Sequence, residues 1–144
     1  MRALCLMALT VVIADQASKL MLRHVLGNGA FALGRCGSLR VVAGRMWLRR
    51  LARPCSGRTI WCVWLAAAAA LATVSALAPF NALFVGLLLG SSFSHAVENS
   101  LRGSITDYIC LRNGAAFNLA DLALAAGATG IVGDVLFMMQ RNLF

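Results

Sequence analysis

Four apolar blocks, each close to the length of a membrane-spanning helix, dominate this chain of 144 residues. They cover about residues 3–21, 60–78, 80–97 and 117–139. A helix needs about 20 apolar residues to cross the hydrocarbon core of a bilayer. With 60% hydrophobic residues, the chain is also more apolar than an ordinary soluble domain. The sequence therefore predicts an all-α membrane protein of one domain, residues 1–144, with four transmembrane helices.

The polar segment between the first two blocks, about Leu22–Thr59, carries most of the positive charge. It contains eight Arg and no acidic residue, and the net charge of the chain is +8. Apolar and basic residues mix around Leu39–Val42 and Met46–Arg49, which predicts short strands or an interfacial helix in a basic loop. Such charge favours contact with membrane phospholipid over contact with nucleic acid, because the Arg would be presented from a membrane.

The charges leave the orientation of the chain in the membrane open. Arg2 and Arg141 favour cytoplasmic termini, whereas the Arg-rich segment itself favours the cytoplasm under the positive-inside rule. An extracytoplasmic loop would allow a Cys36–Cys55 disulfide, and a cytoplasmic one predicts free thiols. The first block can also be interpreted as a secretory signal ending at Ala14, although the helical pattern continues past it.

The five acidic residues all lie inside or at the edge of an apolar block: Asp15, Glu98, Asp107, Asp121 and Asp134. A carboxylate at the centre of a bilayer costs roughly 2.5–3.5 kcal/mol on insertion scales, so each indicates a function or a partner. Asp107 and Asp121 flank one short polar connector that could bring them together. Two carboxyl groups a few ångströms apart do not both ionise easily. One would hold a proton while the other activates water, which predicts acid–base hydrolysis at a membrane surface.

Two further patterns place polar residues near these acids. Asp15 and Lys19 stand four residues apart on one helix face, which predicts an ion pair or a lysine that extends to the interface. Asn118 precedes Asp121 by three residues and could form a hydrogen bond with the carboxylate pair or with the backbone of a substrate. No Cys or His spacing indicates a metal site.

Three motifs of this chain resemble those of the lipoprotein signal peptidases, or signal peptidase II. The segment Asp15–Lys19 is similar to the Asp-Gln-x-Ser-Lys motif of the family. The segment Phe117–Asp121 matches its Phe-Asn-x-Ala-Asp motif, and Asp107–Ile109 resembles its Val-Asp-Phe-Ile motif. The resemblance covers most of the chain and fails in the long loop, where Arg45–Arg50 stands in place of an Asn-x-Gly-Ala-Ala-Phe motif.

The resemblance implies a membrane aspartyl endopeptidase that works without a cofactor. Asp107 and Asp121 would be its catalytic pair, and its substrate would be the signal peptide of a lipid-modified prolipoprotein. It would be a multi-pass protein of the bacterial cytoplasmic (inner) membrane, with the active site facing the extracytoplasmic side.

The third helix departs from the family pattern Gly-Asn-x-x-Asp-Arg. His95, Glu98 and Asn99 stand where that motif has Asn, Asp and Arg, and they still share one helix face. The expected supporting residues are Asn118, Asp15, Lys19, His95, Glu98 and Asn99. These departures suggest a divergent paralogue. They leave open an inactive paralogue that binds lipid or lipoprotein, whereas a transporter is disfavoured because no inverted repeat is visible.

Overall fold

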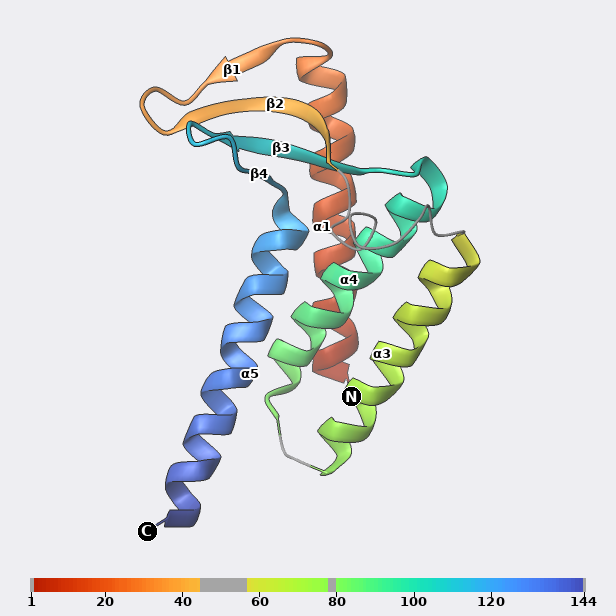
Figure 1. The fold of residues 1–144 in the computed structure, drawn as a ribbon, viewed down its shortest axis with the longest axis vertical. Helices are drawn as coiled ribbons and strands as arrows, with labels where there is room; N and C mark the ends of the chain where they lie inside the picture. Colours follow the sequence, from red (N-terminus) through yellow and green to blue (C-terminus); the bar gives the residue numbers. More distant parts are fainter. Residues whose placement is uncertain (1, 45–56, 78–79, 144) are drawn as a thin grey trace.

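The structure of the chain is a computed structural model that describes residues 2–44, 57–77 and 80–143. Four long helices stand side by side, and a small antiparallel sheet lies across one end of them (Figure 1). The helices are α1 (Arg2–Leu26), α3 (Gly57–Leu77), α4 (Ala82–Arg102) and α5 (Leu119–Leu143). The strands are β1 (Ala30–Ala32), β2 (Gly37–Gly44), β3 (Ile105–Leu111) and β4 (Ala116–Phe117).

Helix α4 is the centre of the bundle and packs against each of the other three helices (Figure 1). Small residues bring α1 close: a side chain at Gly86 or Gly90 would collide with the α1 backbone at Leu4 or Ala8. On the other side, Trp61 and Trp64 of α3 meet Phe93 edge to face. The central position of α4 explains why it buries polar side chains that a lipid-facing helix could not carry.

Three of the described helices are long and apolar enough to cross a membrane: Arg2–Leu26, Gly57–Leu77 and Leu119–Arg141. Helix α4 is not among them, because serines and a cluster of His95, Glu98 and Asn99 lower its hydropathy. A fourth helix therefore exists where the sequence predicted one, while its crossing of the membrane stays a prediction. The break between α3 and α4 is confirmed, since α3 ends at Leu77 and α4 begins at Ala82.

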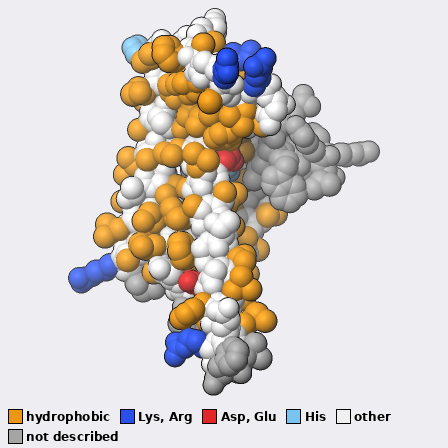
Figure 2. Space-filling model, turned by 90° about the vertical axis from the view of Figure 1, so that its left-hand side faces the viewer, with side chains coloured by type: hydrophobic (Ala, Val, Ile, Leu, Met, Phe, Trp, Pro, Cys, Tyr) orange, Lys and Arg blue, Asp and Glu red, His pale blue; other side chains and the backbone are white. Residues whose placement is uncertain are grey.

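The outer surface of the helices is largely apolar. Figure 2 shows hydrophobic side chains over most of the visible face, with Lys and Arg gathered toward its two ends. Exposed leucine, valine and isoleucine side chains occur on α1, α3 and α5, among them Leu6, Ile13, Leu20, Val63, Leu65, Leu122, Val132 and Leu136. Apolar surface spread over three helices would promote association of a water-soluble protein, whereas in a membrane lipid can cover it.

The strands form one sheet in the order β1-β2-β3-β4, with every neighbouring pair antiparallel. The prediction of short strands near Leu39–Val42 is confirmed by β2, while Met46–Arg49 lies outside the described residues. The all-α prediction is wrong for the connector between α4 and α5, which contains β3 and β4. Ile105, Thr106, Tyr108 and Ile109 supply the β-branched and aromatic residues that favour a strand there.

Both polar segments meet at the same end of the bundle. Strand β2, from the first segment, pairs with β3 from the second, so that Val42 stands opposite Asp107. Both termini lie at the other end, away from the sheet (Figure 1). There Asp134 of α5 accepts a hydrogen bond from the backbone N–H of Asn81, the N-cap of α4. One end of the bundle thus carries the sheet, and the other end carries both termini.

Candidate functional site

The site begins at the first turn of α5, where Asn118 and Asp121 cap the helix reciprocally. The backbone N–H of Asp121 donates to the Asn118 side chain at 3.0 Å, and the backbone N–H of Asn118 donates to Oδ2 of Asp121 at 2.9 Å. This is a capping box, in which side chains three residues apart satisfy two otherwise unpaired donors. Because one oxygen of Asp121 is anchored in this way, the direction of the carboxylate is fixed.

Asp107 reaches the same place from the sheet. It lies in β3, and its Oδ1 accepts a hydrogen bond of 2.8 Å from Nδ2 of Asn118. Strand β2 passes directly over this carboxylate at Gly44, where an added Cβ would collide with Oδ2 of Asp107. Asn118 therefore contacts both aspartates, through its backbone and its side chain. The sequence prediction that Asn118 hydrogen-bonds the pair is confirmed.

Both carboxyl groups line one cavity of about 450 Å³ between the sheet and helices α3, α4 and α5. Its polar lining consists of Asp107, Asp121, His95 and Ser92. The rest is apolar: Ile60, Val63, Trp64, Ala67, Ala96, Ile105, Ala116, Phe117 and Leu124, with Gly44 at the sheet. A few polar side chains thus line a cavity that is otherwise suited to hydrocarbon.

Burial raises the pKa of the Asp107 carboxyl above its ordinary value. The hydrogen bond from Asn118 opposes this shift, the negative charge of Asp121 adds to it, and the charges of Lys19 and His95 oppose it more weakly. The raised pKa means that Asp107 holds a proton more readily than an ordinary aspartate does.

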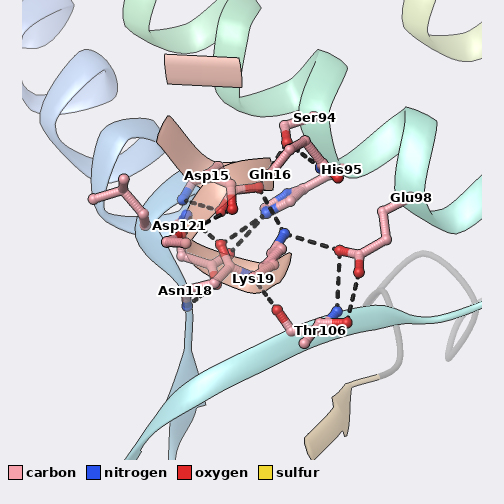
Figure 3. A network of polar contacts seen from close by, with 12 residues as sticks. Asp15, Gln16, Lys19, Ser94, His95, Glu98, Thr106, Asn118 and Asp121 are labelled. Atoms are coloured by element: carbon pink, nitrogen blue, oxygen red, sulfur yellow. Dashed lines mark hydrogen bonds and ion pairs between the residues drawn. The ribbon is translucent and has the colours of Figure 1, made fainter. Parts of the chain in front are cut away.

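A buried network of charges lies beside the pair (Figure 3). Lys19 of α1 bridges two carboxylates, Asp15 at 2.7 Å and Glu98 of α4 at 2.9 Å. Glu98 also binds Arg23 of α1 at 2.6 Å. The predicted Asp15–Lys19 ion pair is confirmed, and Lys19 does not extend to the interface, because its side chain is only 1% exposed. Two cations balance two anions in this network.

The network fixes the elements that carry the two aspartates. Oδ1 of Asp15 accepts a hydrogen bond from the backbone N–H of Ala120, which holds the first turn of α5 against α1. Glu98 accepts hydrogen bonds from the backbone N–H and the hydroxyl of Thr106, the residue before Asp107. Asp15 therefore acts on the position of Asp121, and Glu98 on that of Asp107.

The remaining predicted residues also lie near this centre. His95 is buried on α4, with Nε2 at 3.3 Å from Oδ1 of Asn118 and 3.5 Å from Oδ1 of Asp121. Asn99 is buried one turn further along α4. Asp134 lies at the opposite end of the bundle and takes no part. Among the described residues, no three His, Cys, Asp or Glu side chains group closely enough to hold a metal ion.

Sequence reasoning missed four residues of the site: Arg23, Gly44, Thr106 and Tyr108. The hydroxyl of Tyr108 lies 3.0 Å from Ser18 and accepts a hydrogen bond from the N–H of Leu119. A signal existed for Arg23, because it continues the four-residue spacing of Asp15 and Lys19 on one face of α1. None existed for Gly44 and Thr106, whose roles depend on strand pairing. The proposed partner of Cys36, Cys55, lies outside the described residues.

The chain is similar to known proteins in both sequence and fold. Residues 7–137 match the family model for signal peptidase (SPase) II. A lipoprotein signal peptidase from Methylorubrum extorquens (strain PA1) is 31% identical over 85 residues. That match covers 51% of this chain and 50% of the relative, so the chain matches about half the length of this curated protein.

Two solved structures of bacterial membrane enzymes share the fold. One superposes with a TM-score of 0.81 at 18% identity, over 98% of this chain and 92% of the other. The second has a TM-score of 0.78 at 18% identity and covers 94% of each chain. The family model spans nearly the whole bundle, including the segments that carry Asp15, Asp107 and Asp121. The chain therefore belongs to the signal peptidase II family.

Proposed function

We propose that this chain is a membrane aspartyl endopeptidase that cleaves the signal peptides of lipid-modified prolipoproteins, with Asp107 and Asp121 as its catalytic pair. The observation that carries the proposal is the convergence of these two carboxyl groups, from a strand and from a helix, on Asn118 and on one cavity. Family membership supports a lipoprotein-processing protease.

The geometry suggests a division of roles within the pair. Asp107, whose pKa is raised, would hold the proton and polarise the scissile carbonyl oxygen. Asp121 would accept a proton from a water molecule as that water attacks the carbonyl carbon. The tetrahedral intermediate then collapses when the amide nitrogen leaves with a proton returned from the pair. Water is consumed, the peptide bond breaks, and no metal or cofactor is part of the scheme.

The apolar walls of the cavity support a substrate that carries hydrocarbon. Ile60, Val63 and Leu124 of α3 and α5 line the same cavity as the two aspartates. A segment with an acyl-bearing side chain would place its lipid against these walls and its backbone against the carboxyl pair. The test is incubation of the purified full-length chain with a lipidated prolipoprotein, with release of the signal peptide as the measurement. An unlipidated form of the same substrate is the control.

The competing function is an inactive relative that binds lipid or lipoprotein in the membrane. His95, Glu98 and Asn99, which depart from the Asn, Asp and Arg of the family motif, favour it. Intact substrate bound without peptide release would establish this alternative, whereas release of the peptide would exclude it.

We further propose that the end of the bundle carrying the sheet faces the extracytoplasmic side of a bacterial inner membrane. Cys36 lies exposed in the β1–β2 hairpin at that end, so an impermeant thiol reagent is expected to label a variant with Cys36 as its single cysteine in intact cells or spheroplasts. A single cysteine at Cys5, exposed near the start of α1 at the other end, is the matched control. Labelling of Cys36 only after lysis would reverse the orientation.

Gly44 provides a second test of the role of Asp107. Gly44→Ala is expected to lower cleavage by about 10- to 100-fold, because the new methyl group displaces the Asp107 carboxylate from its contact with Asn118. Gly133→Ala is the control, since an added Cβ there meets nothing within 4 Å. Thermal unfolding of both variants would show whether the fold is retained. Full activity of Gly44→Ala would contradict the assigned position of Asp107.

A further inference from the structure

His95 is the basic side chain that stands next to the carboxyl pair. It is 7% exposed, lines the cavity and points from α4 toward the first turn of α5 (Figure 3). Lys19 and Arg23 are engaged by Asp15 and Glu98 in the neighbouring network. Among residues 2–44, 57–77 and 80–143, no basic side chain other than His95 has a nitrogen within 4 Å of either aspartate of the pair.

The hydrogen bonds of Asn118 determine where the imidazole carries its hydrogen. The Asn118 side chain donates to the carbonyl oxygen of Thr106 through Nδ2 and accepts from the backbone N–H of Asp121 through Oδ1. Since a carbonyl can only accept and an amide N–H can only donate, the amide cannot be flipped. Nε2 of His95 therefore faces an acceptor in Oδ1 of Asn118 and a second acceptor in Oδ1 of Asp121. Nε2 must therefore carry a hydrogen to donate to either oxygen.

The two oxygens of Asp121 have separate roles in this arrangement. Oδ2 is held by the backbone N–H of Asn118 at 2.9 Å, which leaves Oδ1 turned toward His95 at 3.5 Å. Hydrogen bonds in an active site are often long before substrate binds and shorten in the complex. A donor on this side of Asp121 would stabilise its negative charge and keep its orientation constant while the water is activated.

We propose that His95 is a positioning residue of the catalytic centre: its Nε2–H is shared between Oδ1 of Asn118 at 3.3 Å and Oδ1 of Asp121 at 3.5 Å, and it holds the Asp121 carboxylate as the base. This rests on the proposed function. A donor role explains how histidine can replace the asparagine that the family has at this point of α4. Both side chains present an N–H donor, so the carboxyl pair can keep its function. The essential property of residue 95 is then the donor, and the ring as such is dispensable.

The first test is independent of turnover. The chain has two histidines, His24 and His95, and ¹⁵N labelling of their imidazoles in detergent micelles gives two sets of signals that His24→Gln assigns. Asp121→Ala removes one of the two acceptors that Nε2 of His95 faces, so it is expected to move the Nε2 signal of His95 and leave that of the exposed His24 in place. Asp134→Ala, at the far end of the bundle, is the control and should move neither. An unchanged His95 signal in Asp121→Ala overturns the proposal.

The second test separates the donor from the ring. His95→Phe keeps a ring of similar size without a donor and is expected to lower kcat about 10- to 100-fold with KM unchanged, as expected for loss of a hydrogen bond to a charged group. His95→Asn restores a donor and is expected to recover most of kcat. Variants that are equally active, or equally impaired, would contradict a donor role. If the wild type itself releases no peptide, the proposed function fails, and the ¹⁵N result alone decides whether His95 binds Asp121.

Discussion

Asp107→Asn and Asp121→Asn are each expected to abolish signal-peptide release, by at least about 10³-fold, while the protein still folds and inserts into the membrane. Removing the carboxyl of Asp107 removes the group whose raised pKa suits it to hold the proton. Removing that of Asp121 removes the proposed acceptor of the proton from water. Asparagine is nearly isosteric with aspartate, so an amide at position 107 can still contact Asn118 and one at position 121 can still cap α5. The measurement is peptide release from a lipidated prolipoprotein, beside thermal unfolding of each variant.

The control for this pair is Asp134→Asn. Asp134 is also an acidic residue in α5, but it lies at the end of the bundle away from the sheet, where it accepts a hydrogen bond from the backbone N–H of Asn81. Its substitution should leave cleavage within about twofold of the wild type, since surface changes outside special features have small effects. A catalytic role for the pair would be contradicted if either Asp107→Asn or Asp121→Asn retained normal turnover.

The expected pH dependence of cleavage follows from the protonated role proposed for Asp107. Its pKa is raised, so the active, protonated form persists to a higher pH than for an ordinary aspartate and is lost as pH rises through that value. The rate should therefore fall on the alkaline side. Gly44→Ala, which disturbs the surroundings of Asp107, should alter this side of the profile.

The sequence predicted those contacts of the site that join residues close together in the chain. The pairing of Asp15 with Lys19 and of Asn118 with Asp121 follows from helical spacing of four and three residues, and both contacts are present. The four apolar blocks located the helices, since long hydrophobic runs are the strongest sequence signal in a membrane protein. The ends of these helices shifted by a few residues, because caps such as Asn81 decide them.

The contacts that the sequence could not predict are those made across the sheet. Asp107 was expected in a short connector, and it instead lies in β3 opposite β2, which comes from a different polar segment. A side chain at Gly44 would collide with the Asp107 carboxylate, and this constraint depends on that pairing. Arg23 was assigned only to the basic loop, yet its partner Glu98 is 75 residues away in the chain. Long-range pairing of this kind leaves no period in a single sequence.

Glu98 is expected to affect stability more than chemistry, because of the charges around it. Glu98→Gln removes the negative charge that Lys19 and Arg23 share, and it weakens the hold on Thr106. Breaking a buried ion pair by removing one partner costs about 3–5 kcal/mol, since the other charge stays buried without compensation. We expect the free energy of unfolding in detergent micelles to fall by about 3 kcal/mol, because the new amide keeps one acceptor and Asp15 still neutralises Lys19.

Restoring the charge balance gives this prediction its sharpest control. With Asp15 and Glu98 negative and Lys19 and Arg23 positive, the network is neutral, and Glu98→Gln leaves it with one excess positive charge. The double variant Glu98→Gln with Arg23→Gln is neutral again and should recover a large part of the loss, as a non-additive cycle. Arg112→Gln, on an exposed arginine in the turn after β3, should change little. A double variant less stable than Glu98→Gln alone would contradict the charge-balance explanation, because it would show that Arg23 stabilises the fold apart from its pairing with Glu98.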